Sequence, residues 1–272
     1  MLNVKEYVTK KKEELSKIIL TLPKKPTIEI IQVNEDPASN SYIKGKIKDL
    51  EEVGFNYIHT KLPIDISESD LLKRIEESNN NDAIDGFIVQ LPLPPQIDET
   101  KVKQAVAPKK DVDGFNPLST IDPATPKGIV TFLEDNNFDF KGKNALVIGR
   151  SNIVGKPMAN LLLNKDMNVT VVHSKTSKED FKFYIEHADL IVISVGKQAL
   201  LKNEFNFKKD TIVIDVGINR GEDGKLHGDC EPNLNVFFQT PVPGGVGLLT
   251  RLALLLNLIE VSKNRKEIKN GF

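Results

Sequence analysis

Apolar residues recur along the first half of the chain with two alternating periods. Residues 4 to 19 carry apolar side chains at helical spacing, and "TIEIIQV" at 27–33 is an apolar run of strand length. The helical period returns in "EDPASNSYIKGKIKDLEEVGF" and "SESDLLKRIEESNN", whereas "FNYIHTKLP" and "DGFIVQLPLPP" are of strand type. This alternation of helix and strand predicts an α/β layer.

Local signals predict where these elements begin and end. Asp36 can cap the second helix, Pro37 suits its first turn, and Gly54 can end it. The strand in "DGFIVQLPLPP" must end near Leu91, because prolines cannot donate to a sheet ladder.

The second half repeats the alternation with longer apolar runs. "NALVIG", "NVTVVH", "DLIVISVG" and "TIVIDVGIN" are nearly continuous in apolar residues, as expected for a parallel sheet covered on both faces. "VFFQTP" predicts one more short strand. The last apolar helix, from about residue 248, is expected to pack on the first lobe.

A stretch rich in proline and turn formers, residues 114 to 127, suits a boundary between two lobes. We therefore predict an α/β fold with two lobes around a cleft, the second being a Rossmann-like doubly wound parallel sheet. The first lobe takes residues 1–118 with 249–272, and the second takes residues 119–248.

Composition narrows the class of protein. The 272 residues include 37 basic and 38 acidic side chains, which argues against nucleic acid as a partner. Cys230 is the single cysteine, so no disulfide framework or Cys-based metal cluster is expected, which fits a reducing cytosol. The charged N-terminus lacks the apolar core of a signal peptide, and "LALLLNLIE" is shorter than the roughly 20 residues that span a bilayer. We expect a soluble cytoplasmic protein with no membrane partner and no bound metal.

The stretch "VIGRSNIVGKP" at 147–157 resembles a dinucleotide-binding loop without its middle glycine. Gly149 allows a tight turn after the strand, Gly155 allows close helix approach, and Ser151 stands where the middle glycine would be. Backbone N–H groups at the helix start can face an anion. By itself this stretch is equally compatible with an ordinary strand-to-helix turn.

The following strand favours a nucleotide site. An NAD-preferring fold usually has Asp or Glu about 20 residues beyond the glycines. Here the strand ends in "VVHSKT", which supplies Ser174 and no acid, and Arg150 lies in the first loop. Cationic and hydroxyl groups suit a 2′-phosphate, so we predict NADP. Ile218 follows the strand "TIVIDVG" and would lie at the same carboxyl edge.

Four polar side chains of the first lobe could line one cleft. Tyr42 and Lys46 are four apart on a helix and share a face, Gln90 ends an apolar strand, and Asp113 lies in an acid–glycine turn. Each has a plain structural alternative: a packed tyrosine, a lysine with its head in water, a loop-satisfying amide and a turn aspartate. A desolvated lysine can lose several pKa units and act as a base, which gives the set a chemical use.

The glycines of "TPVPGGVGLLT" at 240–250 precede the last helix. The stretch lacks the G-K-[ST] ending of a phosphate-binding P-loop, so ATP is not expected. Gly244, Gly245 and Gly247 suit close backbone approach to a flat ligand, and a flexible hinge is compatible with the same residues.

Taken in order, these motifs resemble the bifunctional methylenetetrahydrofolate dehydrogenase/methenyltetrahydrofolate cyclohydrolase family. The resemblance covers nearly the whole chain through "DPASNSYIKGK", "DGFIVQLPLP", "PKKDVDGFNP", "TPKG", "GRSNIVGKP", "HSKT", "DVGIN" and "TPVPGGVG". It implies oxidation of 5,10-methylenetetrahydrofolate with NADP and hydrolysis of the methenyl product to 10-formyltetrahydrofolate. It also implies a homodimer formed through the NADP-binding lobes, with folate bound by the first lobe.

The resemblance further implies roles for individual residues. The catalytic set falls on Tyr42, Lys46, Gln90 and Asp113. The substrate-binding set adds Val89, Leu91, Pro243, Gly244, Gly245, Val246 and Gly247. The cofactor set falls on Gly149, Arg150, Ser151, Ser174 and Ile218.

Three positions depart from the family pattern, and two other functions stay open. The segment between Phe115 and Thr125 is short, Ala124 replaces a common cysteine, and Asn116 replaces a frequent histidine. An NADP-dependent dehydrogenase of another substrate is one alternative, since two α/β lobes serve several oxidoreductases. A silent nucleotide-binding module is the other, and the joint presence of Lys46 and Gln90 argues against it.

Overall fold

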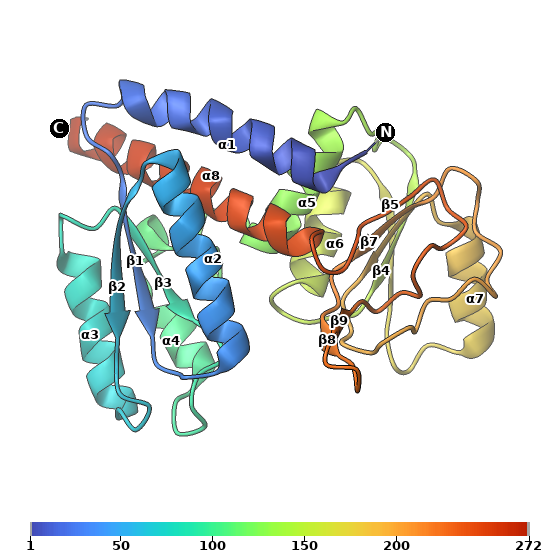
Figure 1. The fold of residues 1–272 in the computed structure, drawn as a ribbon, viewed down its shortest axis with the longest axis horizontal. Helices are drawn as coiled ribbons and strands as arrows, with labels where there is room; N and C mark the ends of the chain where they lie inside the picture. The colour runs from blue at the N-terminus through green and yellow to red at the C-terminus, as the bar shows by residue number, and fades with distance from the viewer. Residues whose placement is uncertain (1, 271–272) are drawn as a thin grey trace. The chain divides into compact units, whose positions relative to one another are not determined.

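The computed structural model describes residues 2–270 of the chain, with side chains to residue 264, and shows an α/β protein (Figure 1). It divides into two compact units. The five-stranded unit holds Met1–Val8 and Thr125–Thr250, and the three-stranded unit holds Thr9–Ala124 and Arg251–Phe272. The predicted folate-binding and NADP-binding roles of the two lobes stay predictions.

The first eight residues fall with the five-stranded unit, whereas the sequence analysis assigned residues 1–118 to the other lobe. The reason is the packing of Tyr7, whose ring lies edge-on to Phe132 at 5.1 Å between centroids. Its hydroxyl also donates to Asp135 at 2.7 Å. These contacts are 125 or more residues apart in sequence, so no local pattern could indicate them.

The three-stranded unit alternates strands and helices as its sequence pattern predicts. Its strands are β1 (Thr27–Gln32), β2 (Asn56–Lys61) and β3 (Gly86–Gln90), and its helices are α2 (Pro37–Val53), α3 (Glu68–Asn80), α4 (Glu99–Ala105) and the 3-10 helix Pro108–Lys110. Two longer helices, α1 (Val4–Thr21) and α8 (Val246–Asn270), each have residues in both units. The short α4 has no predicted counterpart.

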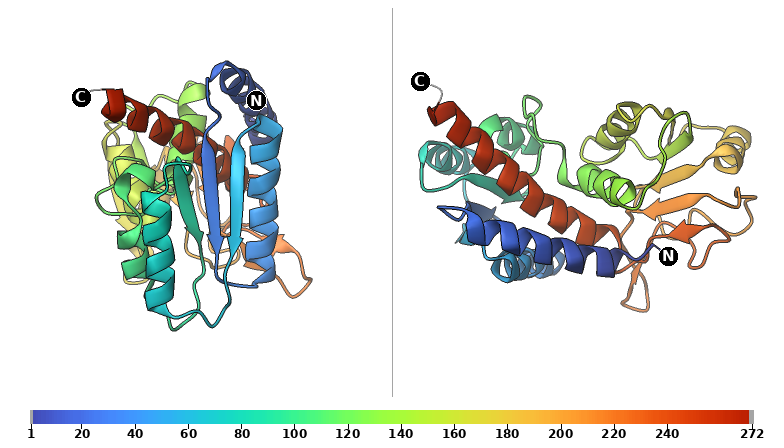
Figure 2. Two further views of the ribbon diagram at one scale, coloured as in Figure 1. Left: turned by 90° about the vertical axis from the view of Figure 1, so that its left-hand side faces the viewer. Right: turned by 90° about the horizontal axis from the view of Figure 1, so that it is seen from above.

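The parallel sheet of this unit has the order β2-β1-β3. Helices α2 and α3 lie on opposite sides of it (Figure 2), as right-handed crossovers in opposite directions require. One face packs Ile31, Leu71, Ile75 and Phe87, all with no exposed surface, and each such side chain stabilises the fold by about 1.5–3 kcal/mol. The sheet therefore fixes where α2 and the end of β3 lie.

The predicted ends of α2 are confirmed. Asp36 accepts the Ser39 N–H at 2.7 Å, Pro37 begins the helix, and Gly54 ends it in the left-handed conformation at φ 95°. An Asp cap of this kind is worth about 1 kcal/mol. Lys46 is thus presented from a helix whose two ends the sequence specifies.

The five-stranded unit is a doubly wound parallel sheet with the order β10-β7-β6-β4-β5. Its elements are α5 (Ala124–Asp135), β4 (Asn144–Ile148), α6 (Gly155–Leu163), β5 (Asn168–Val172), α7 (Lys178–His187), β6 (Leu190–Ile193), β7 (Ile212–Asp215), β8 (Asn219–Arg220), β9 (Leu226–His227) and β10 (Phe238–Gln239). The strand order reverses between β4 and β6, and ligands of such sheets bind outside the carboxyl ends at that point. The Rossmann-like prediction is confirmed.

Three details differ from the sequence analysis. β5 is an edge strand with Val171 39 % exposed, although its apolar run predicted cover on both faces. The turn-rich stretch 114–127 already contains the start of α5 at Ala124. The hairpin of β8 and β9 was not predicted, because two-residue strands leave no periodicity.

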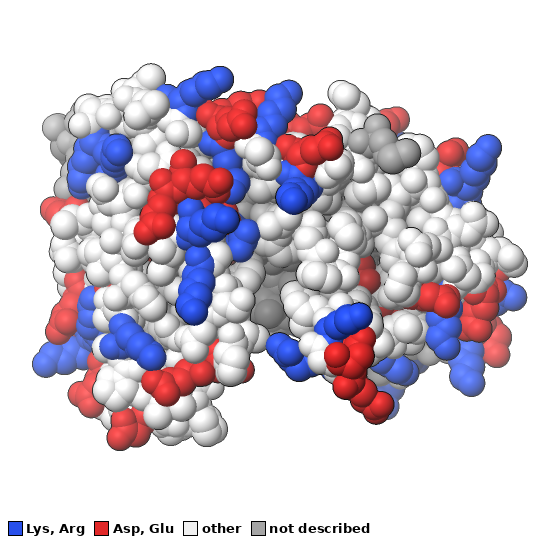
Figure 3. Space-filling view, viewed as in Figure 1, with Lys and Arg blue, Asp and Glu red and all other residues white. Residues whose placement is uncertain are grey.

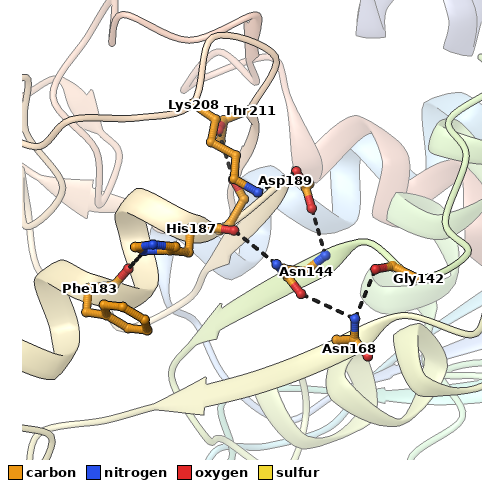
Figure 4. Close-up of polar contacts among 9 residues, drawn as sticks. Gly142, Asn144, Asn168, Phe183, His187, Asp189, Lys208 and Thr211 are labelled. Atoms are coloured by element: carbon orange, nitrogen blue, oxygen red, sulfur yellow. Dashed lines mark hydrogen bonds and ion pairs between the residues drawn. The ribbon is translucent and has the colours of Figure 1, made fainter.

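Polar side chains tie the strands together at their amino ends, shown in Figure 4. Asn168 donates to Gly142 O at 2.9 Å and to Asn144 Oδ1 at 3.3 Å, while the Asn144 N–H donates to Asp189 at 2.8 Å. Lys208 donates to the second Asp189 oxygen at 2.8 Å. The predicted cofactor residues lie at the opposite, carboxyl edge of the sheet, away from these contacts.

Within the described part of the chain, no helix combines the length and the apolar character needed to cross a membrane.

Candidate active site

Lys46 and Gln90, predicted to act together, are in direct contact. The Lys46 Nζ donates to Gln90 Oε1 at 3.0 Å, and Gln90 Nε2 donates to Leu91 O at 2.7 Å. Both side chains are buried, at 5 % and 8 % exposure. Tyr42, one turn earlier on α2, holds its ring centroid 5.0 Å from the Lys46 nitrogen. The lysine therefore has an amide, not a carboxylate, as its hydrogen-bond partner.

The electrostatic surroundings of Lys46 disfavour its charged form. Burial lowers the pKa of the Lys46 ammonium below its ordinary value, and the Arg251 cation lowers it further, while the Asp113 carboxylate opposes both. Burial raises the pKa of Asp113, against the influence of Lys46 and Lys103. A lysine whose charged form is disfavoured in this way is a better candidate for a proton acceptor than an exposed lysine.

The neighbouring Asp111 has a structural role. It is 3 % exposed and accepts the backbone N–H groups of Gly114 at 2.9 Å and Asn116 at 2.8 Å, which shapes the turn that carries Asp113. Burial raises the pKa of Asp111 to about 6. The Asn116 side chain donates to Val106 O at 2.8 Å, so this departure from the family pattern also serves the turn.

A small cavity of about 20 Å³ opens beside Asp113. It is lined by Phe87, Ile88, Val89, Leu91, Val102, Lys103, Val106, Asp111, Asp113 and Phe115. The walls are mostly apolar, and the charged groups among them are the carboxylates of Asp111 and Asp113 and the Lys103 amine. A carboxylate can accept N–H donors. Three of the predicted substrate-binding residues, Val89, Leu91 and Asp113, lie in this lining.

Four loops of the five-stranded unit begin side by side at the carboxyl edge. The Gly149 N–H donates to Val172 O, the Ser194 N–H to Ile148 O, and the Val216 N–H to Ile193 O, each at 2.9 Å. The predicted cofactor residues Arg150 and Ser174 therefore follow neighbouring strand ends. Both are exposed, and the end of β5 presents no carboxylate.

The turn after β4 requires glycine at two positions. Gly149 has φ +118°, and a Cβ there would lie 2.6 Å from Ser194 O. A Cβ on Gly155 would overlap the Gly149 carbonyl. The turn after β4 therefore packs closely on the neighbouring strand end, and only glycine fits at these two positions.

Ser151 replaces the middle glycine of the usual motif and bonds the backbone just before and at the start of α6. Its hydroxyl accepts the N–H groups of Val154 and Gly155, each at 3.2 Å. Ile218, another predicted cofactor residue, is 62 % exposed after β7, an unusual degree for isoleucine. A 600 Å³ cavity beside β10 is lined by none of the five predicted cofactor residues.

Two buried carboxylates that the sequence analysis missed organise this edge. Asp229 accepts the N–H groups of Val195 at 2.7 Å, Gly196 at 3.0 Å and Lys197 at 2.8 Å, which fixes the loop after β6. Asp215 accepts the Cys230 N–H at 2.8 Å. Asp215 opens the motif "DVGIN", but the sequence analysis gave it no role, and Asp229 lies outside the quoted motifs.

The glycine stretch 243–247 belongs to the five-stranded unit and leads into α8. Gly244 has φ +96°, and neither it nor Gly247 has an atom within 4 Å of an added Cβ, so the backbone there is open. A Cβ on Gly245 would overlap Pro241 O. The predicted substrate contacts of Pro243 to Gly247 stay a prediction.

Comparison with known proteins agrees with this geometry. Residues 2–113 match the catalytic domain of tetrahydrofolate dehydrogenase/cyclohydrolase, and residues 123–266 match its NAD(P)-binding domain. The chain belongs to the tetrahydrofolate dehydrogenase/cyclohydrolase family. The resemblance predicted from the motifs is thereby confirmed.

Individual members of the tetrahydrofolate dehydrogenase/cyclohydrolase family match over almost their full length. The bifunctional protein FolD of Oceanobacillus iheyensis is 39 % identical, covering 99 % of each chain. The structure of the bifunctional FolD methylenetetrahydrofolate dehydrogenase/cyclohydrolase of Campylobacter jejuni is 38 % identical with a TM-score of 0.91, covering 97 % of this chain and 98 % of that one. The Trypanosoma brucei enzyme, solved with NADP cofactor and an inhibitor, is 29 % identical with a TM-score of 0.90, covering 97 % of both.

Proposed function

We infer that this protein is an NADP-dependent methylenetetrahydrofolate dehydrogenase and methenyltetrahydrofolate cyclohydrolase. It oxidises 5,10-methylenetetrahydrofolate to the 5,10-methenyl cation and hydrolyses that cation to 10-formyltetrahydrofolate. The observation that carries the proposal is the buried Lys46 amine bonded to the Gln90 amide, in a chain whose two parts match the two family domains. One chain is thus both an oxidoreductase and a hydrolase.

The oxidation step needs positioning more than acid–base chemistry. When bound, NADP accepts the hydride that the methylene carbon loses. A neutral folate becomes a cation in this step, so no residue has to remove a proton. The tasks left to the protein are to hold the folate carbon in place and to exclude water.

The hydrolysis step does need a proton acceptor. Water adds to the methenyl carbon, and the neutral Lys46 amine accepts the proton that the water loses. Opening of the ring then returns a proton to the departing folate nitrogen. Gln90 orients the amine without restoring its charge, and the Tyr42 ring covers one side of it.

We propose that Asp113 accepts N–H donors of the pterin ring, beside the apolar residues Val89 and Leu91. Pro243 to Gly247 contribute further substrate contacts through exposed backbone. A carboxylate suits these donors, because a hydrogen bond to an ionised group is stronger than one between neutral groups.

The cofactor is proposed to be NADP, bound by Gly149, Arg150, Ser151, Ser174 and Ile218. An exposed guanidinium and hydroxyl at adjacent strand ends suit a 2′-phosphate, and a carboxylate that would hold the ribose of NAD is absent from the end of β5. The tight glycine turn between β4 and α6 is the proposed place of the pyrophosphate.

We further propose a cytoplasmic homodimer that works in one-carbon metabolism and supplies formyl groups for purine biosynthesis. A single buried cysteine suits a reducing compartment. The half-exposed edge strand β5 could pair with a second copy. Basic and acidic side chains are interspersed on the face drawn in Figure 3, and the net charge is −1, which supports a small-molecule rather than a nucleic-acid partner.

The test is an absorbance assay with 5,10-methylenetetrahydrofolate and either NADP or NAD. Formation of the methenyl product and its subsequent decay are expected with NADP. No turnover with either cofactor would contradict the proposed function, whereas a preference for NAD would contradict only the cofactor assignment.

A further inference from the structure

Asn257 is a fully buried polar residue in the apolar stretch "LALLLNLIE" of α8. Burying an amide without hydrogen bonds is costly, so it needs partners there. Its Nδ2 donates to Val112 O at 2.8 Å and to Asp122 O at 3.1 Å. Both acceptors are backbone carbonyls of the same three-stranded unit, 145 and 135 positions earlier in the chain.

The two carbonyls belong to the turn from Val112 to Ala124, which carries Asp113. The Val112 carbonyl lies in the peptide plane shared with Asp113, and such planes are rigid. Holding this carbonyl therefore fixes the direction in which the chain enters Asp113. On the other side, the Ala124 N–H donates to Asp113 O at 3.2 Å. Asp113 is thus held at the peptide bond before it and at the one after it.

The arms of this turn pack closely against each other and against β3. Gly114 has φ +71°, and a Cβ there would lie 2.6 Å from Ile121 O in the opposite arm. A Cβ on Gly86 of β3 would overlap the Val112 side chain. With one arm seated on the strand, Asn257 joins it to the other arm through its two hydrogen bonds.

We propose that Asn257 is a positioning residue for substrate recognition, whose amide holds the Val112–Asp113 peptide so that the Asp113 carboxylate faces the cavity beside Val89 and Leu91. The inference rests on the proposed role of Asp113 as the acceptor of pterin N–H donors. Hydrogen bonds weaken steeply when the donor and acceptor are misaligned, so this role depends on the direction of the carboxylate.

The contacts of Asn257 differ from those that only hold the turn closed. Asp111 already accepts the N–H groups of Gly114 and Asn116 from inside the turn. Asn257 instead bonds the peptide that leads into Asp113. Its Oδ1 has no hydrogen-bond partner among the residues that the structure describes, so the amide acts through its two donors.

The experiment measures how strongly the full-length protein prefers a ligand with the pterin 2-amino group. Calorimetry gives the dissociation constants of 5-formyltetrahydrofolate and of its 2-desamino-2-methyl counterpart, which lacks those N–H donors. Wild type should prefer the first by at least about tenfold, as a hydrogen bond to a charged group implies. Asn257→Leu removes both donors at similar volume and should reduce the preference to less than about threefold.

Two further variants separate positioning from stability. Asn257→Ser is too short to reach both carbonyls and should also reduce the preference, without adding bulk. Asn79→Leu is the matched control, because Asn79 donates to Ala105 O at 2.8 Å in the same unit. It should lower the thermal midpoint and leave the preference unchanged. A purely structural role for Asn257 would give the same result in Asn257→Leu and Asn257→Ser, and that result would overturn the proposal.

A double-mutant cycle tests whether Asn257 acts through Asp113. In an Asp113→Ala background, Asn257→Leu should change the affinity for 5-formyltetrahydrofolate by less than about twofold, although it costs about tenfold in the wild-type background. Equal losses in both backgrounds would overturn the inference while leaving the proposed function intact. A wild-type protein that binds neither ligand would contradict the proposed function, and the inference with it.

Discussion

At the level of single residues, the Lys46–Gln90 contact suggests a way for one small site to serve the two proposed reactions. A carboxylate partner would favour the ammonium form of the lysine, whereas the Gln90 amide holds the amine without adding charge. In the mechanism proposed above, hydride transfer makes no use of that amine, whereas hydration of the methenyl cation does. The two activities should therefore respond differently to loss of the lysine.

Replacing Lys46 with methionine is expected to separate the two activities. Cyclohydrolase turnover should fall by about 10³-fold, within the range that a general base contributes, while dehydrogenase turnover falls by less than about tenfold. Both rates are measured from the absorbance of the methenyl intermediate. The exposed Lys48→Met on the same helix is the control, and equal loss of both activities in a folded Lys46→Met protein would contradict this division of roles.

Asp111 should make stability depend on pH in an identifiable window. Its pKa is raised to about 6 in the folded protein, so between about pH 4 and pH 6 the folded state binds more protons than the unfolded state. Its contribution to the free energy of unfolding therefore falls as pH rises through this window, by at most about 3 kcal/mol, and is constant above it. Chemical denaturation of wild type and Asp111→Asn at several pH values measures this difference, and a gap that does not change from pH 4 to pH 6 would refute the prediction.

At the scale of elements, the turn between β4 and α6 is the proposed place of the dinucleotide. Its geometry depends on a glycine at φ +118° packed on the Ser194 carbonyl of the neighbouring strand end. Ser151 satisfies N–H groups at the helix start, which explains why the middle glycine of the usual motif can be replaced. Asp229 fixes the adjacent loop after β6 by accepting three consecutive backbone N–H groups.

Gly149→Ala is expected to disrupt cofactor binding. The new Cβ would lie 2.6 Å from Ser194 O, so the turn must move, and the KM for NADP should rise at least about tenfold. Gly142→Ala is a matched control, because Gly142 also has a positive φ of +70° but no atom within 4 Å of an added Cβ. Steady-state kinetics with varied NADP measure both, and similar effects in the two variants would point to backbone strain rather than to the cofactor turn.

At the scale of the whole molecule, two compact units are built from interleaved segments of one chain. Helices α1 and α8 have residues in both units, although each unit has its own parallel sheet and its own core. Binding of a ligand to the native form of one unit must raise the stability of that unit by mass action.

NADP should therefore raise the thermal midpoint of the protein. At 100 times its dissociation constant it stabilises the native five-stranded unit by about 2.7 kcal/mol, and NAD at the same concentration should give a smaller shift. Differential scanning calorimetry measures the shift, which the Gly149→Ala variant should lack. An equal or larger shift with NAD would contradict the assignment of Arg150 and Ser174 to a 2′-phosphate.

The sequence alone determined the features that depend on neighbours along the chain. The alternating periods predicted both α/β layers, Asp36, Pro37 and Gly54 predicted the ends of α2, and the ordered motifs predicted the family. It also placed Lys46 and Gln90, with Tyr42 and Asp113, in one set that could line a cleft. Local backbone preference and side-chain period depend on residues that are close together in the sequence. They can therefore be predicted without the tertiary structure.

Only the tertiary structure decided which distant residues meet. Arg251, 205 positions beyond Lys46, pairs with Asp49 on the helix that carries the lysine, and the local trace of its packing is the glycine at position 45 inside that helix. Likewise Asp229 reaches the loop after β6, and Tyr7 joins the five-stranded unit through Phe132. Charges and packing act through space, so the pKa of a buried group and the membership of a unit depend on neighbours that no local pattern identifies.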